Sequence, residues 1–187
     1  TLDSKAIFAV GALDNESGDI TEATMFNYTY QMNLNTSFTG DDNLYVRLKS
    51  GNAVKNVDPF ATAADGSYLS STNTNGDALK VDKIWYEFPL GEKHTVWIGP
   101  RIENYYMHGA SPSIYSPTLK QFKLGGNGAA YGASTDRGIG WAYNADNGFS
   151  VSSNVVSKGG SDGGTAAVNN TVAFTAAQIK ALEVEIA

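Results

Sequence analysis

A strict two-residue alternation over residues 25–38 is the feature that most constrains the fold of this chain. From Phe26 to Phe38 the even-numbered positions are apolar, interrupted only by Thr36, and the odd-numbered positions carry amides and hydroxyls. A strand sends successive side chains to opposite faces, so one face of this segment is apolar and the other is neutral and polar. Strands of soluble sheets usually run about 5–6 residues, whereas a tilted strand needs roughly 9–11 residues to cross a bilayer. Taken alone, the segment fits a membrane-barrel strand and a long hairpin strand of a soluble β-sandwich equally well.

Composition narrows the class of protein. The chain has 187 residues, enough for one domain or two small ones, and only 17% of them are charged, where about a quarter is usual for soluble domains. Abundant glycine and tyrosine, 20 and 10 residues, favour strands and turns. The net charge of −6 and the lack of a basic stripe argue against nucleic-acid binding. No apolar run approaches the length of a spanning helix. The chain starts at Thr1 without a signal sequence, which predicts a processed protein or part of a longer product.

Further strands are predicted along the chain, and their connections indicate how they are joined. The predicted strands cover residues 5–13, 43–49, 82–88, 94–99, 138–143 and 149–156, and all but the first have one apolar parity. Short, turn-rich connections at 39–42, 89–93 and 144–148 alternate with long ones at 14–22, 51–79, 100–137 and from 157 onward. In an up-and-down sheet this places all short turns at one end. Outer-membrane barrels have that asymmetry, so the pattern favours a barrel over a sandwich.

The C-terminal region is harder to interpret. Residues 157–172 are rich in glycine and serine, which predicts a flexible loop. Beyond it, Ile179, Leu182 and Ile186 lie at helical spacing after a possible N-cap at Thr175, although residues 182–186 also alternate as a strand. Good helix formers in this stretch favour the helix. We therefore predict a β-barrel region over residues 1–174 and a short helical or irregular tail over 175–187.

Several phrases resemble cyanobacterial outer-membrane porins of the carbohydrate-selective (OprB-type) family. NLNTSFTGDDNLYVRLKSGN at residues 33–52 resembles an early hairpin of that family, and VDKIWYEFPLG at 81–91 is similar to the next arm. FKLGGNGAAYGAS at 122–134, with GIGWAY and NGFSVSSNVVS after it, is similar to the following stretch. The match covers roughly residues 5–160 in order. The tail AAQIKALEVEIA departs from it, because it lacks a terminal aromatic residue and looks like the helix that precedes the barrel in the family.

The resemblance implies an antiparallel, up-and-down transmembrane β-barrel, or part of one, in the outer membrane of a Gram-negative-type bacterium. It implies passive diffusion of small hydrophilic solutes such as sugars, inorganic ions or iron, contact with outer-membrane lipid, and a homotrimer. Family members are longer than this chain, so we expect a partial or rearranged porin. Seven or eight strands would close only the smallest barrel, whose interior is filled by side chains.

The polar parity of the predicted strands supplies the candidate pore lining. These residues are Asn27, Thr29, Gln31, Asn33, Tyr45, Arg47, Lys49 and Glu87. Fixed charges among them would bias which ions enter, and Arg47 with Lys49 would favour anions locally. Tyr45 and Trp85 offer faces on which a sugar stacks, but interior packing is the preferred interpretation of both.

Catalytic and metal-binding signatures are absent or weak. The chain has no nucleophile elbow, P-loop or zinc-protease motif, and His94 and His108 are isolated in the sequence. The acidic stretch at 14–19 lacks the spacing of a calcium loop. We therefore predict no enzymatic activity, no cofactor, no bound metal and no nucleic-acid partner. The alternative function is a secreted or cell-surface β-sandwich, an adhesin or carbohydrate-binding module, using exposed aromatic residues of the segment 100–120.

Overall fold

In a computed structural model of the protein, the described residues form an all-β fold of eight strands. The structure describes residues 1–14, 24–62, 66–108, 116–122, 135–158 and 169–178. The strands are β1 (Leu2–Gly11), β2 (Met25–Thr36), β3 (Asn43–Gly51), β4 (Lys80–Pro89), β5 (His94–Ile102), β6 (Asp136–Asn144), β7 (Ser150–Lys158) and β8 (Asn169–Gln178). Two short 3₁₀ helices, η1 (Asn104–Met107) and η2 (Lys120–Phe122), lie between β5 and β6 in the chain.

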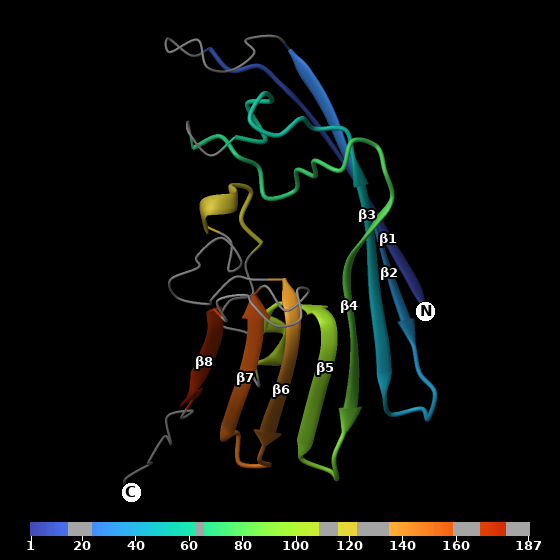
Figure 1. Ribbon diagram of the computed structural model, residues 1–187, viewed down its shortest axis with the longest axis vertical. Coiled ribbons are helices and arrows are strands. Elements are labelled where there is room, and N and C mark those ends of the chain that lie inside the picture. Colours follow the sequence, from blue (N-terminus) through green and yellow to red (C-terminus); the bar gives the residue numbers. More distant parts are fainter. Residues whose placement is uncertain (15–23, 63–65, 109–115, 123–134, 159–168, 179–187) are drawn as a thin grey trace, which may run out of the picture.

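All eight strands form one antiparallel sheet in the order of the sequence, from β1 to β8. The predicted all-β, up-and-down topology is therefore confirmed. The turns that join β2 to β3, β4 to β5 and β6 to β7 lie at the same end of the sheet (Figure 1). Long connections occupy the opposite end, as the alternation of short and long connections predicted.

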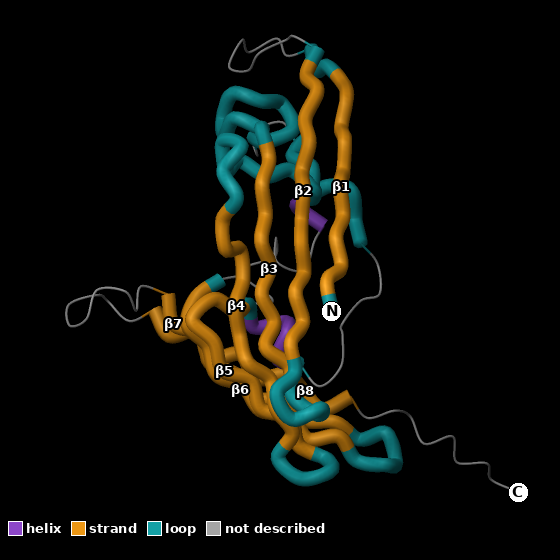
Figure 2. The backbone as a smooth tube through the Cα atoms, turned by 90° about the vertical axis from the view of Figure 1, so that its right-hand side faces the viewer, coloured by secondary structure: helices purple, strands orange, loops and turns teal. Residues whose placement is uncertain are grey.

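The sheet is strongly curved and open. Within the described residues, β1 pairs only with β2 and β8 pairs only with β7, so two edge strands remain. Figure 2 shows β1, β2 and β3 as long upright strands, with β5, β6 and β7 turned away from them at one end. Closure into a barrel is not observed among these residues.

The C-terminal region departs from the sequence prediction. Strand β8 begins at Asn169 within the segment predicted to be a flexible loop, and it pairs with β7 from Lys158↔Asn169 to Ser150↔Gln178. Residues 175–178 belong to this strand, so the helix predicted to start at Thr175 is wrong there. Regular pairing to a neighbouring strand outweighs the helix-forming composition of this stretch, because tertiary context overrides propensity. Residues 179–187 lie outside the described part of the chain.

The inner, concave face of the sheet is covered by chain that follows β3 and β5. A buried cluster forms where η1 packs on this face; it contains Tyr45, Trp85, Trp97, Ile102, Met107, Ala142 and Val156. Gly140 provides the space for η1, because a β-carbon on Gly140 would lie 2.7 Å from Met107 Cβ. Gly138 and Gly140, at alternate positions of β6, thus leave space for the Met107 side chain, which is fully buried.

Two long connections are joined to each other beside this cluster. Ser70 N donates to Thr118 O at 2.6 Å and Lys120 N donates to Tyr68 O at 2.8 Å, around an antiparallel bridge between Leu69 and Leu119. We call residues 68–70 and 118–120 the loop bridge. It ties the β3–β4 connection to the β5–β6 connection and so limits how far either can move from the sheet.

Candidate functional site

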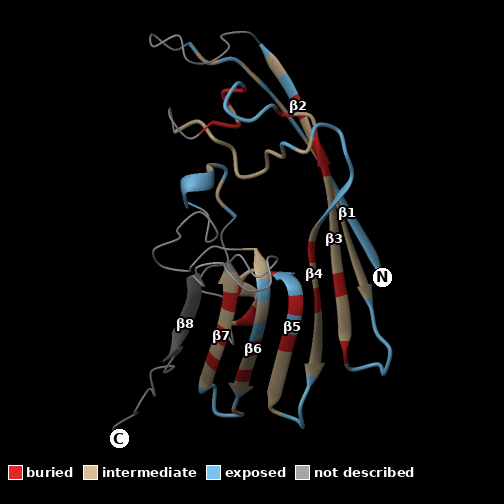
Figure 3. Ribbon diagram, in the orientation of Figure 1, coloured by how far each residue is buried: buried red, intermediate tan, exposed pale blue. Residues whose placement is uncertain are grey.

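The two faces of the sheet show an inverted distribution of polarity. On the inner face, polar side chains of β2 and β7 are buried next to the apolar cluster, and Asn27 and Asn154 are 6% and 2% exposed. On the outer face, Phe26 is 65% exposed and Ile139 is 53% exposed. Figure 3 shows the buried residues as alternate bands along β5, β6 and β7. Water-soluble proteins bury the apolar parity of a strand, whereas here the large apolar side chains of the outer parity are exposed.

The register brings all predicted pore-lining residues to the inner face. Gln31 lies opposite Lys49, and Asn33 lies opposite Arg47. Tyr45 lies opposite Trp85 on β4, and Asn27, Thr29 and Glu87 have the same parity as these residues within their strands. Residues directly opposite each other on paired strands share a face. The eight candidates therefore share one surface, the inner face of β2, β3 and β4, in which Tyr45 also belongs to the buried apolar cluster.

Arg47 lies at the centre of this surface. Its Nε donates to Asn33 Oδ1 at 2.9 Å, and its Nη1 donates to the Tyr106 hydroxyl at 3.1 Å. The Tyr45 hydroxyl donates to the same Asn33 oxygen at 2.8 Å. These contacts hold the guanidinium against the inner face and connect β2 and β3 to η1.

Two aromatic residues that the sequence offered as stacking platforms are packed into the interior. Tyr45 and Trp85 are 9% and 5% exposed, and their ring centroids lie 4.1 Å apart in a stacked arrangement. Tyr106 of η1 also packs against Trp85, with ring centroids 4.8 Å apart. Interior packing therefore accounts for both residues. Their rings leave little face for a sugar.

A buried ion pair links the sheet to the start of the β5–β6 connection. Lys83 Nζ on β4 lies 2.7 Å from Glu103 Oε1, with 5% of the Lys83 side chain and 15% of the Glu103 side chain exposed. Burial by itself raises the pKa of Glu103, but the charge and hydrogen bond of Lys83, helped by Thr135, lower the pKa below its ordinary value. The carboxylate therefore stays ionised at neutral pH and neutralises Lys83.

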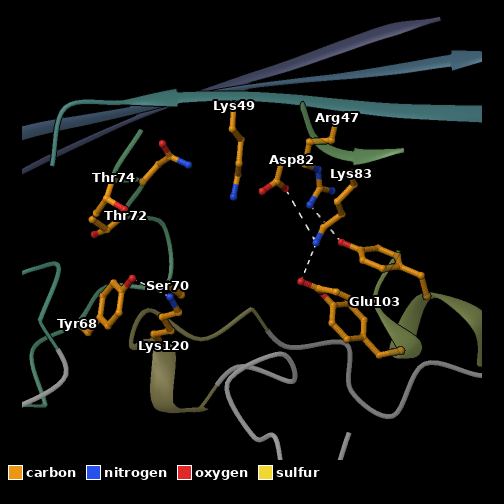
Figure 4. Close-up of a pocket in the computed structure, with 13 residues that line it drawn as sticks. Arg47, Lys49, Tyr68, Ser70, Thr72, Thr74, Asp82, Lys83, Glu103 and Lys120 are labelled. Carbon is orange, nitrogen blue, oxygen red and sulfur yellow. Dashed lines mark hydrogen bonds and ion pairs between the residues drawn. The ribbon is translucent and has the colours of Figure 1, made fainter. Parts of the chain in front are cut away.

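A polar cavity adjoins these residues, between the inner face of β3 and β4 and the loop bridge. Its volume is about 290 Å³, and thirteen residues line it. In Figure 4, Lys49 extends from β3 into this space, Arg47 and Lys83 lie on one side, and Lys120 lies across from them. The strand alternation identified Arg47 and Lys49. Tyr68 and Lys120 belong to loops, where no local pattern shows which strand they will approach.

Aromatic side chains gather on the outer face at the short-turn end. Neighbouring ring centroids there are 6.2 Å apart for Phe38 and Tyr86, and 5.6 Å apart for Tyr86 and Phe88. His94 continues the row, with its ring 5.6 Å from the Trp141 ring and 5.0 Å from the Tyr143 ring. We call these six residues the turn-end aromatic row.

The outer apolar surface has a definite extent. At the loop end of β1 and β2 the rings of Phe8 and Phe26 form a second aromatic contact, with centroids 6.2 Å apart. On β5 and β6 the surface ends earlier, at the exposed side chains of Arg101 and Arg137. The surface is therefore taller on the long strands β1 to β3 than on β5 and β6.

The β2–β3 turn is organised by Asp42. Its carboxylate accepts hydrogen bonds from the Ser37 hydroxyl at 2.6 Å and from the Phe38 and Thr39 amides, both at 2.9 Å. The Tyr86 hydroxyl, from the turn-end aromatic row, also donates to it. Hydrogen bonds from Ser37 and Tyr86 hold the pKa of Asp42 far below its ordinary value.

Other kinds of site were sought in the described residues. No group of three or more histidine, cysteine or acidic side chains there is arranged to hold a metal ion. Within the same part of the chain, no helix is long and apolar enough to cross a membrane. The role of the isolated His94 is structural in this fold, since its Nδ1 accepts a hydrogen bond from Trp141 Nε1 at 3.1 Å.

Two cyanobacterial proteins are similar to this chain. "Uncharacterized protein alr4550" of Nostoc sp. (strain PCC 7120) is 30% identical over 164 residues, which cover 82% of this chain and 27% of that protein. "Uncharacterized protein sll0772" of Synechocystis sp. (strain PCC 6803) is 34% identical over 77 residues, covering 41% of this chain and 14% of that protein. The chain thus spans about a quarter of the length of the first relative. No protein-family model and no solved structure match it.

Proposed function

We propose that this chain forms part of the wall of an outer-membrane β-barrel porin, which passes small hydrophilic solutes by diffusion. The observation that carries the proposal is the inverted polarity of the sheet, with polar side chains buried on the inner face and Phe26 and Ile139 exposed on the outer face. In a membrane barrel the outer face meets lipid and the inner face meets a wet or filled lumen.

The spacing of the aromatic residues supports this proposal. Tyr28 and Phe38 are separated by ten positions on the outer parity, of which the last two lie in the turn after β2, so they span at most about 33 Å. At a tilt of about 40° this corresponds to at most about 25 Å along the membrane normal, the height of the apolar band of outer-membrane barrels. The turn-end aromatic row then lies at one membrane interface, where tyrosine and tryptophan are enriched.

The open edges and the length of the relatives are consistent with a larger sheet. An exposed edge strand presents unpaired backbone donors and acceptors, which hydrocarbon does not tolerate. Strands outside the described residues, or in a longer product, would pair with β1 and β8 to close the barrel. A trimer of such barrels, as the porin resemblance implies, is part of the same proposal.

The soluble β-sandwich has less support. A sandwich buries the apolar face of one sheet against a second sheet. All eight strands in the described part of the chain belong to one sheet, and its apolar face stays exposed. An adhesin or carbohydrate-binding module of this kind would need a second layer from elsewhere.

Channel recordings test the proposed function. The full-length protein that carries this chain is reconstituted into planar lipid bilayers, and its conductance and reversal potential are measured under a salt gradient. We expect stepwise conductance increases. We also expect the double substitution Arg47→Glu and Lys49→Glu to shift the reversal potential towards cation preference, because fixed charges on a pore wall select the permeating ion.

A control variant, compared with the single substitution Lys49→Glu that changes the net charge by the same amount, separates a local effect from a change in total charge. Lys55→Glu alters an exposed loop residue outside the polar cavity and is expected to leave the reversal potential unchanged. Absence of any conductance from inserted protein would contradict the porin proposal. An unchanged potential in the double variant, with conductance intact, would show that the inner face of β3 does not border the permeation path.

A further inference from the structure

The polar cavity between the sheet and the loop bridge has the size and enclosure of a small-molecule site. Its volume of about 290 Å³ lies near the lower end of the range for ligand pockets, about 300–1,000 Å³. Strands β3 and β4 form one wall, and the loop bridge, held by the backbone hydrogen bonds of Ser70 and Lys120, forms the opposite wall (Figure 4). A solute of monosaccharide size or smaller fits in this space.

Positive charge predominates in this cavity although the whole chain is acidic. Four cationic side chains line it, namely Arg47, Lys49, Lys83 and Lys120, against the two carboxylates of Asp82 and Glu103. The excess of two positive charges contrasts with the net charge of −6 for the chain. A cleft lined by an excess of one sign of charge attracts counter-ions of the opposite sign.

Both carboxylates of the cavity lie near Lys83, with Glu103 Oε1 at 2.7 Å and Asp82 Oδ2 at 4.0 Å from its Nζ. Glu103 Oε1 forms the closer ion pair with Lys83 Nζ, so the Glu103 carboxylate neutralises the buried ammonium of Lys83. Arg47 donates to two uncharged partners, Asn33 and the Tyr106 hydroxyl. The Arg47 guanidinium has no carboxylate of the described residues within ion-pair distance, although the charge of Asp82 in the same cavity acts on it.

Lys120 is held in a similar way on the opposite wall. Its Nζ donates to the Tyr68 hydroxyl at 2.7 Å and lies 4.0 Å from the centroid of the Tyr68 ring. Both contacts are with a neutral residue, and an ammonium has three hydrogens to donate. Tyr68 thus orients the ammonium and leaves it capacity to donate to a ligand.

Hydroxyl and amide groups complete the lining. Ser70, Thr72, Asn73 and Thr74 come from the β3–β4 connection, and Tyr105 comes from η1. Burial, together with the neighbouring carboxylate of Glu103, raises the pKa of Tyr105, so its hydroxyl keeps its proton at neutral pH. Such groups bind the hydroxyls of a polyol, while the cations bind an acidic group on the same molecule.

We propose that this cavity binds a small oxyanion: a carboxylate or phosphate group, either free or on a solute no larger than a monosaccharide. Arg47 and Lys49 contact it from the sheet, and Lys120 contacts it from the loop bridge. The site rests on the proposed function only in its use as a selective step in permeation. Its binding chemistry is independent of a channel.

Binding calorimetry on the full-length protein in detergent tests the proposal. The probes are inorganic phosphate, gluconate and the neutral comparator glucose. We expect phosphate or gluconate to bind at least about tenfold more tightly than glucose, and the affinity to fall as salt is raised. Comparison of the first two probes identifies whether a phosphate or a carboxylate is the preferred group.

Charge-removing variants locate the site. Lys120→Gln and Lys49→Gln are each expected to weaken anion binding by about tenfold or more, because each removes a charge-assisted hydrogen bond. Lys55→Gln makes the same change in net charge on an exposed loop outside the cavity and is expected to leave the affinity within about twofold of the parent. Lys120 is itself exposed, so its substitution is compatible with folding, which circular dichroism verifies.

The outcomes separate this site from the porin proposal. Glucose binding as tightly as both anions, no anion binding, or an affinity unaffected by Lys120→Gln would overturn the oxyanion site. Conductance without oxyanion binding would leave the porin proposal standing alone. Oxyanion binding without conductance would retain the site and remove the porin.

Discussion

Replacement of Met32 by lysine distinguishes a lipid-facing outer surface from a water-facing one. Met32 lies on the outer parity of β2, opposite Leu48 of β3 and Ser4 of β1. It is four positions from Tyr28 and six from Phe38, so in the proposed orientation it lies near the middle of the apolar band. A lysine at the bilayer midplane of a barrel costs about 2–4 kcal/mol. That cost corresponds to a roughly 30- to 700-fold loss in the folding equilibrium constant.

The same substitution has a different consequence if the outer face meets water. An exposed methionine replaced by lysine on a soluble surface changes stability by about 0.5 kcal/mol or less. The assay is urea-induced unfolding in phospholipid vesicles, followed by the fluorescence of the three tryptophans. Gln31→Lys is the matched control, because Gln31 is the adjacent residue on the inner face.

We expect Met32→Lys to lower the unfolding midpoint strongly and Gln31→Lys to lower it less, since Gln31→Lys leaves the charge on the polar face, although Lys5 and Lys49 lie opposite it. Equal, small effects of both substitutions would refute the lipid-facing assignment of the outer surface. A larger effect at Gln31 than at Met32 would reverse the two faces.

Three further substitutions test the packing of the inner face and the turn. Gly140→Ala is expected to destabilise the fold by about 1–3 kcal/mol in the same unfolding assay, because its β-carbon would lie 2.7 Å from Met107 Cβ; unchanged stability would mean that η1 does not sit on β6. Glu103→Gln removes the nearer carboxylate of buried Lys83 and leaves it only Asp82 Oδ2, 4.0 Å from its Nζ; removal of one partner of a buried pair costs up to roughly 3–5 kcal/mol. Because the pKa of Glu103 is lowered in the fold, its stabilising contribution is present above the ordinary glutamate pKa and is lost as the pH falls through the folded-state pKa. The parent protein should therefore lose stability in that acidic range of pH. A Glu103→Gln protein with the same acid dependence would contradict the assignment. Asp42→Asn weakens the acceptor shared by the turn amides. Hydrogen exchange should therefore show reduced protection at the Phe38 amide. Unchanged protection there would mean that Asp42 is dispensable for the turn.

The sheet could be predicted from the sequence because strand alternation is a local property. The parity of residues 26–34 is sufficient to assign the two faces of β2, and the alternation of short and long connections is sufficient to order the strands. Strand β8 was missed because glycine and serine precede it and helix formers follow it. Its assignment depends on hydrogen bonds to β7, which are non-local.

The candidate site could be predicted only in part, for the same physical reason. Arg47 and Lys49 were assigned to the inner face from parity alone. Lys120 enters the cavity through a backbone bridge between two loops that are distant in the sequence, and no periodicity encodes that pairing. The alternate glycines of β6 are visible in the sequence. The packing of Met107 against them, which explains why they are small, is visible only in the structure.

The most direct test of the central claim is a single-cysteine spin-label scan of β2 in lipid vesicles. This chain itself contains no cysteine, so only cysteines elsewhere in the full-length protein need to be replaced. Labels are placed one at a time on residues 26–36 of the full-length protein, and their collisions with lipid-soluble oxygen and with a water-soluble nickel chelate are measured. We predict a two-residue period, with labels at Tyr30, Met32 and Leu34 accessible to oxygen and shielded from the chelate, and with oxygen accessibility highest near Met32. Chelate accessibility at these even-numbered positions, or no alternation along β2, would contradict a lipid-facing outer surface.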